Sequence, residues 1–594
     1  MKRIRIVLIA LLLCLVGSLA FSLFYAAERA PEKRVYEVGV DPLPYSDREI
    51  YEQLFDLSNK VQVDIQMSEA ELQKLEQDYE DYLARGSKSP IYRLCDVTIT
   101  ITTDSKTTVY KIPEVGVRMK GNTSRTWFYD TQSGIYNHIH LKLDFQETFD
   151  DEAYYGSDSK AWQSKEARKL RKNRTFAMLE KLDLRWNKCG DSTYLKEAYA
   201  YRIYEAQGVL APRVGLCSLD WSGSHMGVYT ICEPVDELFL QKRLPQEDLG
   251  GDLYKLGWSA DGANFTVANY YGVEDEDKGE FYAYDLKTNK KTSDHSALLR
   301  LITELNSGEM TKERFGQLVD IEPFLQYAAV SYFLGNPDDL RNGYNNSYIY
   351  FLKSSGKMIV IPYDTDRCLG VVYEWDPTGN GVTADDPFTL ERAAGGYQRS
   401  PLYLYSIVKG GWYVPEFSRA LEEVAAGELL QPDTFEALYR QVEAIYGSDA
   451  QPSRPMNNSG GRSYAFSLDS GFGGNWSFRS YMAAKMEAYR SPADNTPILW
   501  NCYIRASFCD WEQEEAYRMQ PSGAGLTIDL RCATGFEFKI YDADTQVWYG
   551  AEIVTPQTDV AYTASEKHNN VVLPAGSYRL HFDPITRRLT IKKL

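Results

Sequence analysis

Three segments in the first quarter of the chain alternate apolar and polar residues, which is the pattern of half-buried β-strands. They are "VQVDIQ" (residues 61–66), "CDVTITITT" (95–103) and "HIHLKLDF" (138–145). An alternation with period two cannot present one apolar face as a helix, so these segments must pair in a sheet. Helical patterns appear later, in "DSTYLKEAYAYRIYEAQG" (191–208) and "DIEPFLQYAAVSYFLG" (320–335). Separate strand-rich and helix-rich regions predict an α+β fold.

The composition excludes one class of partner. The 594 residues are 44% hydrophobic and 25% charged, as in folded globular proteins, and the net charge is -18. Binding of nucleic acid through its phosphates needs a basic surface. We therefore expect no nucleic-acid partner.

The N-terminus predicts export. "MKRIR" precedes the apolar run "IVLIALLLCLVGSLAFSLFYAA", which is nearly long enough to cross a bilayer. We interpret residues 1–27 as a signal anchor or a cleaved signal peptide, with the anchor favoured, and residues 28–45 as a polar linker. Either interpretation predicts that the rest of the protein lies outside the cytoplasm, anchored to the membrane or secreted.

Cysteine and histidine usage argues against zinc chemistry. The nine cysteines form no CxxC pair, and the six histidines form no HExxH motif. Cys502 and Cys509 are close enough in sequence to pair, whereas most of the others read as buried thiols. We expect a core that does not depend on disulfides.

The chain changes character near residue 500. "LTIDLRC", "GFEFKIYDA", "VWYGAEIV", "NNVVLPAGSYRLHFD" and "RRLTIKKL" are short strands separated by turns. They predict a small all-β sandwich over residues 496–594, after a larger domain over residues 46–495.

Acidic and amide side chains flank one predicted hairpin in the larger domain. "GNPDDLRNGYNNSYIYF" leads into its first strand, and "KMIVIPYDTDRCLG" contains its second. Hard oxygen ligands of this kind suit Mg²⁺ or Ca²⁺ rather than zinc. The order Asp, then Asn, then a hairpin, then Asp is the order of catalytic and metal-binding groups in protein kinases. The alternatives are turn-capping residues and a structural calcium site.

Basic groups supply the other half of a phosphate site. Gly121 in "VRMKGNTSR" permits a close backbone turn, with Arg118, Lys120 and Arg125 around it. Lys142 has the opposite parity to Leu141 and Leu143 and therefore faces away from the core, as a phosphate-binding lysine would. Lys255 is its rival, and Glu197 is a candidate carboxylate to pair with such a lysine. Solvent-exposed lysines and a surface ion pair are the alternatives.

Together these segments resemble the CotH-like spore-coat protein kinase family. The matching pieces are "VGVRMKGNTSR", "GVLAPRVGLCSLDWSGSHMGVYTICEPVD", "GDLYKLGW", "GNPDDLRNGYNNSYIYF" and "IVIPYDTDRCLG", in the family's order, over about residues 50–490. The resemblance implies a divergent protein-kinase-like fold and an atypical secreted kinase. Such an enzyme uses ATP and Mg²⁺ to phosphorylate serine or threonine of a protein, and the resemblance implies an acceptor in the spore coat or at the cell surface.

The resemblance also implies roles for residues. Asp338 or Asp339 is the catalytic carboxylate, and the metal ligands are Asn345, Asn346, Asp364 and Asp366. The nucleotide-binding set comprises Arg118, Lys120, Gly121, Asn122, Ser124, Lys142, Glu197 and Glu233. In this chain "GIYNH" replaces the basic cluster that usually precedes the "LKLDF" strand, which weakens the assignment of Lys142.

Two other functions fit the same sequence. One is a non-catalytic surface protein that keeps the fold and binds the cell wall, and the other is a transferase that moves AMP instead of phosphate. The C-terminal unit is similar to starch-binding sandwiches. Trp548 and Tyr549 would form its sugar platform and Asn569 or Asn570 its polar partner, with aromatic core residues as the alternative.

Overall fold

A computed structural model describes most of the chain. The described residues are 47–121, 124–130, 132–257, 262–266, 283–372, 387–388, 400–408, 411–459, 463–469, 476–490, 501–522, 525–543, 546–551, 557–583 and 587–594. The apolar segment 1–27, the linker 28–45 and Asn122 lie outside them. Within these ranges, no helix combines the length and the apolar character needed to cross a membrane.

The first half of the domain folds into a closed seven-stranded barrel, in the order β1-β2-β3-β6-β7-β9-β8. All neighbours are antiparallel except β1 and β8, which close the barrel in parallel. The strands are β1 (Lys60–Gln66), β2 (Arg93–Thr102), β3 (Thr107–Lys120), β6 (His140–Asp144), β7 (Lys181–Trp186), β8 (Val214–Trp221) and β9 (Ser224–Cys232). The three alternating segments are thus strands, as predicted, and their apolar residues fill one core.

Short elements surround the barrel. They are α2 (Asp47–Phe55), α3 (Glu69–Ala84), β4 (Tyr129–Asp130), β5 (Ile135–Tyr136), α4 (Glu152–Tyr155) and α5 (Lys165–Arg171). Helix α3 is capped by Ser68, because Glu71 N donates to Ser68 Oγ at 3.3 Å. Leu83, in the last turn of this helix, is exposed, whereas Leu72 and Leu75 are buried.

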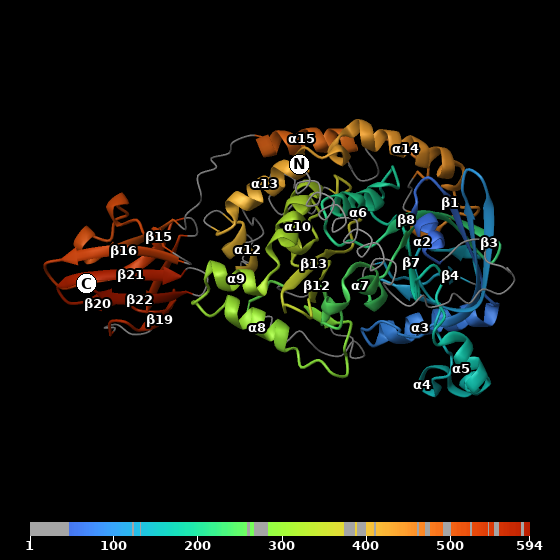
Figure 1. Cartoon of the computed structure of the whole chain (residues 1–594), viewed down its shortest axis with the longest axis horizontal. Coiled ribbons are helices and arrows are strands. Elements are labelled where there is room, and N and C mark those ends of the chain that lie inside the picture. The colour runs from blue at the N-terminus through green and yellow to red at the C-terminus, as the bar shows by residue number, and fades with distance from the viewer. Residues whose placement is uncertain are drawn as a thin grey trace, which may run out of the picture.

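Helices and a second sheet form the other half of the domain. The sheet has the order β11-β10-β12-β13, from β10 (Leu253–Leu256), β11 (Tyr284–Leu286), β12 (Ser347–Phe351) and β13 (Met358–Pro362). The helices are α6 (Lys196–Ala206), α7 (Glu237–Arg243), α8 (Ser296–Leu305), α9 (Lys312–Leu318), α10 (Ile321–Leu334), α11 (Leu340–Gly343), α12 (Pro401–Ser406), α13 (Val414–Ala425), α14 (Pro432–Tyr446) and α15 (Phe478–Arg490). Figure 1 shows the barrel at one end of the molecule and these elements in its middle.

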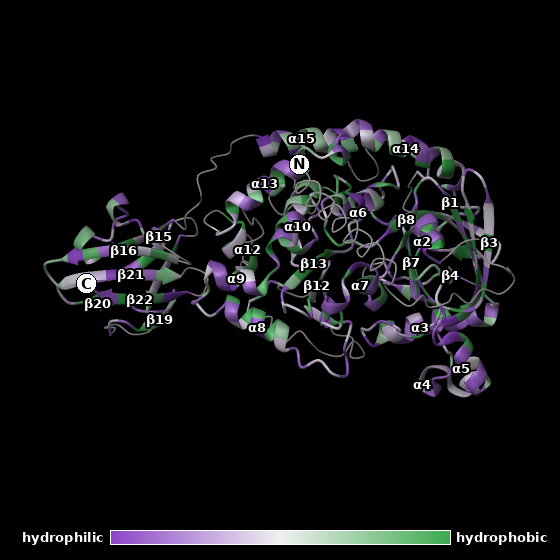
Figure 2. Ribbon diagram, viewed as in Figure 1, coloured by the Kyte–Doolittle hydropathy of each residue, from purple (hydrophilic) through white to green (hydrophobic). Residues whose placement is uncertain are grey.

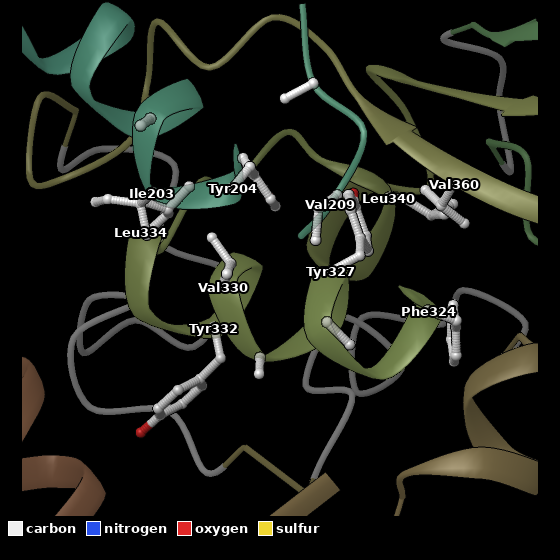
Figure 3. Close-up of a cluster of buried hydrophobic side chains, with 14 of the residues drawn as sticks. Ile203, Tyr204, Val209, Phe324, Tyr327, Val330, Tyr332, Leu334, Leu340 and Val360 are labelled. Carbon is white, nitrogen blue, oxygen red and sulfur yellow. The ribbon is translucent and has the colours of Figure 1, made fainter. Parts of the chain in front are cut away.

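Helix α10 is the centre of this half. It begins after Asp320, as predicted, and its side chains from Phe324 to Leu334 are buried except for Gln326. Figure 3 shows Tyr327 and Val330 of α10 beside Tyr204 and Val209, which come from α6 and the segment after it. Surface helices differ, since hydrophilic and hydrophobic residues alternate around α14 in Figure 2. The packing fixes the loop that leaves α10, which carries Asp338.

The C-terminal unit is all β, as predicted. Its strands are β14 (Cys502–Ala506), β15 (Gln520–Ser522), β16 (Gly525–Cys532), β17 (Phe536–Asp542), β18 (Val547–Ala551), β19 (Ala561–Ser565), β20 (Val571–Leu573), β21 (Gly576–Asp583) and β22 (Arg588–Lys593). They are linked into one continuous sheet around a core of their own. The eight cysteines that the structure describes are all thiols, so no disulfide joins Cys502 to Cys509.

Candidate active site

The centre of the candidate site is a buried arginine that the sequence analysis did not single out. Arg185 lies on β7, and its side chain is 4% exposed. Its Nη1 is 2.7 Å from Glu197 Oε1 on α6, and its Nη2 pairs with Asp364 Oδ1 just after β13. Asp366 Oδ2 is 3.5 Å from the same guanidinium. One side chain therefore joins the barrel, a helix and the end of the second sheet.

The three carboxylates around Arg185 are electrostatically unequal. Burial raises the pKa of Glu197 to about 7 and that of Asp366 to about 6, with repulsion from Asp364 adding to both shifts. Burial alone would also raise the pKa of Asp364, but Arg185 and Lys255 outweigh it and hold the pKa below its usual value. One guanidinium cannot balance three ionised carboxylates, so an added cation would be favourable here.

Asp338 lies in a cradle of amides. Asn345 Nδ2 donates to its Oδ1 at 3.1 Å, and Asn346 Nδ2 donates to its Oδ2 at 3.0 Å. Asn336 connects this cradle to the metal-ligand candidates, because its Oδ1 accepts from Asp338 N at 3.0 Å and its Nδ2 donates to Asp364 O at 3.1 Å. The structure thus brings Asp338 and Asp364 into one hydrogen-bonded group.

Asp339 has a different environment. It is the N-cap of α11, where its Oδ1 accepts from Asn342 N at 2.8 Å, and its Oδ2 accepts from the Ser331 hydroxyl. Burial raises its pKa to about 6. A carboxylate used in this way stabilises the loop, and this geometry favours Asp338 as the reactive group of the two. Both assignments remain predictions.

The basic groups line the barrel side of the site. Lys120 pairs with Asp183 on β7 and donates to the Tyr363 hydroxyl at 2.8 Å, and Lys142 Nζ is 3.4 Å from Asp183 Oδ1. Lys142 faces away from the barrel core, as its parity predicted. The expected pairing of a lysine with Glu197 is not formed, because Arg185 occupies that carboxylate.

Lys255 approaches from the other sheet. Its Nζ lies 4.6 Å from the centre of the Tyr363 ring. The atoms packed around this side chain, with repulsion from Lys120, lower its pKa to about 7. Of the two rival lysines, Lys255 therefore lies against the residue that precedes Asp364, whereas Lys142 contacts Asp183.

The turn after β3 has the predicted tight geometry. Gly121 has φ of +102°, and a Cβ there would lie 1.9 Å from Ser124 Oγ. Ser124 Oγ donates weakly to Lys120 O at 3.4 Å. Arg118 is turned aside, since its Nη1 donates to Ser89 O at 3.1 Å and its guanidinium stacks on Tyr92.

Glu233 is not brought to this site. It is fully buried, with Arg243 Nη2 at 2.6 Å and Lys242 Nζ at 3.0 Å from its carboxylate. Tyr51 OH and Arg213 N also donate to it, at 2.9 and 3.0 Å. These contacts tie α2, α7 and the barrel together. A role for Glu233 in nucleotide binding stays a prediction.

The side chains at this site suit a Mg²⁺ ion that is held partly by phosphate and water, rather than a metal ion held by protein ligands alone. Among the described residues, no group of three or more His, Cys, Asp or Glu side chains is arranged to hold a metal ion. Mg²⁺ in phosphate-transfer sites is held by one or two carboxylates and completed by phosphate oxygens and water. Asp364 and Asp366, with the amide oxygens of Asn345 and Asn346, fit that requirement.

The signal for Arg185 was present in the sequence. In "KLDLRW" (181–186) Leu182 and Leu184 alternate with Asp183 and Arg185, and this segment is strand β7. Recognising it as a strand would have placed Asp183 and Arg185 together on the face away from the core.

The comparison with protein families agrees with this arrangement. The family model described as "CotH kinase protein" matches residues 130–475. The chain belongs to the CotH kinase family. The match contains Arg185, Glu197 and both acidic segments, whereas the turn at Gly121 precedes it and the C-terminal unit follows it.

One curated relative of this CotH-family chain is the "Inner spore coat protein H" of Bacillus subtilis (strain 168). The two are 26% identical over 187 residues, which is 30% of this chain and 48% of the relative. The chain therefore spans about half the length of the relative that it matches.

Proposed function

We propose that this CotH-family chain is an extracytoplasmic protein kinase that transfers the γ-phosphate of ATP to serine or threonine. The observation that supports it most is the convergence of Asp338 and Asp364 through Asn336, beside the buried Arg185. Phosphoryl transfer depends on positioning and charge stabilisation rather than on covalent chemistry, and this group offers both.

Each of these side chains has its own role in the proposed transfer. Asp338 orients the acceptor hydroxyl and accepts its proton as the new phosphate ester bond forms and the bond to the ADP oxygen breaks. Asp364 and Asp366 would hold Mg²⁺, with Asn345 and Asn346 turning their amide oxygens to it. The ion supplies positive charge to the phosphate oxygens. Arg185 keeps Asp364 in place against Glu197.

The nucleotide phosphates belong on the basic side. Lys120, Lys142 and Lys255 lie around Asp183 and Tyr363, and the turn at Gly121 lets backbone amides approach an anion. Asp183 neutralises part of this charge, so the lysines are held in position before a nucleotide arrives.

The acceptor is proposed to be a protein of the spore coat or cell surface. The name of the matched relative, an inner spore coat protein, supports this class. The N-terminal apolar segment supports export and membrane attachment.

The test is transfer from ATP labelled at the γ-phosphate, using residues 28–594 with Mg²⁺. We expect labelled protein with the native chain and at least about 100-fold less with Asp338→Asn or Asp364→Asn. Intact-mass analysis of the modified product separates phosphate from AMP. Equal labelling in both variants would refute the assignment, and failure of the native chain to bind Mg²⁺–ATP would favour a non-catalytic binding protein.

A second proposal concerns polysaccharide binding by the C-terminal unit. Tyr549 pairs with Ile540 and packs against the core, so it cannot share a platform with Trp548. Trp548 lies on the other face of the strand. The centroid of its ring is 4.9 Å from that of Tyr541 and 6.4 Å from that of Trp511, and the Arg505 guanidinium lies over the Trp548 ring. Partly exposed aromatic rings suit sugar stacking.

This proposal is tested by sedimentation with insoluble cell-wall glycans. We expect Trp548→Ala to lose binding and Lys567→Ala, an exposed change elsewhere on the unit, to keep it. Unchanged binding by the Trp548 variant would refute the platform.

A further inference from the structure

A cavity of about 370 Å³ lies at the rim of the barrel, outside the site described above. Its walls come from the end of β7, the loop that follows it, strand β9 and residues 463–467. Lys120, Lys142, Asp338 and Asp364 do not line it. Trp186 lines the cavity, and it directly follows Arg185 on β7. Successive side chains of this strand point to opposite faces, so Arg185 lies in the candidate active site and Trp186 lies in the cavity.

Aromatic rings form much of the wall. The rings of His138 and Trp186 are stacked, with centroids 5.1 Å apart and planes 14° apart. The centroid of the Tyr464 ring lies 5.7 Å from that of the His138 ring, and Tyr194 also lines the cavity. Flat aromatic walls favour a flat aromatic occupant, because offset stacking of rings adds to the gain from burying its apolar area.

The wall is held in place before any ligand arrives. His138 Nδ1 is 3.3 Å from Tyr229 OH, and its Nε2 is 3.1 Å from Tyr464 OH. Asn458 binds the backbone of His138 from both sides, accepting from its N and donating to its O at 2.8 Å each. A ligand that stacks here has little side-chain ordering to induce.

The described part of the lining disfavours anions. Among the described residues around the cavity there is no lysine or arginine, and Asp191 is the single carboxylate. Asp191 already accepts from Thr193 Oγ at 2.8 Å and from Lys196 N at 2.8 Å. Lys196, which is not among the lining residues, attracts Asp191 electrostatically. A phosphate or carboxylate group in the cavity would face the Asp191 carboxylate, and the described lining would offer it neutral hydrogen-bond donors but no cation.

Polar partners for a neutral ligand are present. The hydroxyls of Ser463 and Ser467 line the cavity. Each accepts a backbone N–H, from Ala465 and Asp469 respectively, at 3.2 and 3.1 Å. A serine hydroxyl that accepts can also donate, so each can bind a polar atom on the edge of a ring.

We propose that this cavity is a second binding site, for a flat aromatic small molecule that carries no negative charge and stacks on Trp186. Its volume lies at the lower end of the range of about 300–1,000 Å³ that is typical of small-molecule sites. That size admits a two-ring heterocycle with a short substituent.

The test compares three probes that share one ring and differ in charge: tryptamine, tryptophol and indole-3-propionate. Ligand-observed NMR titration of residues 28–594 measures each affinity. We expect the cationic and neutral probes to bind, and the anionic probe to bind at least about tenfold more weakly, which is 1.4 kcal/mol. Equal binding of all three, or binding of none, would overturn the proposal.

Variants locate the binding. Trp186→Leu removes the stacking surface, and Ala465→Phe fills the cavity from an exposed position; each should weaken tryptophol at least about tenfold. Ala465→Ser is the matched control and should bind normally. Asp364→Asn should also keep tryptophol binding, because that residue does not line the cavity. Full binding by Ala465→Phe in a protein with native thermal unfolding would place the probe elsewhere and refute the site.

Discussion

Replacing Glu233 by Gln should destabilise the protein strongly, because that carboxylate is an anion buried among cations. Burial would raise its pKa, but Arg243 and Lys242 outweigh it and lower the pKa from 4.5 to about 2. A shift of about 2.5 units, at 1.36 kcal/mol for each unit, corresponds to about 3 kcal/mol of stability at neutral pH. Removing one partner of a buried ion pair typically costs about 3–5 kcal/mol, in agreement.

The sign of the pH dependence follows from the lowered pKa. The contribution is complete above about pH 4.5, where the unfolded carboxyl is also ionised, and is lost as pH falls toward 2. Urea unfolding followed by tryptophan fluorescence should therefore give a free-energy gap between native and Glu233→Gln proteins at pH 7 that shrinks below pH 4.5. Glu237→Gln, at an exposed position on α7, is the control and should change stability by less than about 0.5 kcal/mol.

The same variant separates two roles for Glu233. If it only ties elements together, folded Glu233→Gln protein keeps its affinity for Mg²⁺–ADP. Stability unchanged within about 1 kcal/mol, with nucleotide binding lost, would refute the structural reasoning and favour the expectation from the sequence.

Three further predictions concern the site and the barrel. Asp338→Asn should lower phosphate transfer about 10²–10⁴-fold with little change in thermal unfolding, whereas Asp339→Asn should mainly lose about 0.5–2 kcal/mol of stability by calorimetry; the reverse pattern would exchange their roles. Gly121→Ala should weaken ATP binding in a titration, because its Cβ meets Ser124 Oγ at φ +102°, and native affinity would contradict a close-fitting turn. Glu76 on α3 accepts hydrogen bonds from Phe128 N and Tyr129 N at 2.7 and 2.9 Å, and burial raises its pKa to about 7. Its ionisation therefore costs stability as pH rises from about 4.5 to 7. Glu76→Gln should be more stable than the native protein at pH 8 and equal to it at pH 4, and a loss at pH 8 would show that these two hydrogen bonds need the charge.

Local patterns predicted the elements well. Alternation located β1, β2 and β6, and the helical patterns located α6 and α10. They could not predict that the barrel closes, because pairing of β1 with β8 depends on strands far apart in the sequence. In the C-terminal unit the short pairing of β18 with β19 links two groups of strands around one core, and the sandwich stays a prediction.

The sequence predicted which acidic side chains lie together, but it did not predict which cations pair with them; the roles of these residues stay predictions. The order of Asp338 and Asp364 around a hairpin was sufficient to predict their convergence. Residue order did not identify the cation that pairs with Glu197. Any nearby cation can pair with a carboxylate, and the fold brings Arg185 to it instead of a lysine. The order of residues likewise did not predict the ion pairs of Glu233 with Lys242 and Arg243, and its role in nucleotide binding stays a prediction.

The closure of the barrel has a consequence for synthesis. Val63 pairs with Leu219, so the edge of the first strand stays open until most of the first half of the domain has left the ribosome. Exposed strand edges recruit other chains, and contacts between distant residues form slowly. A chain that lacks β8 leaves this edge unpaired, so truncations that end before β8 should aggregate.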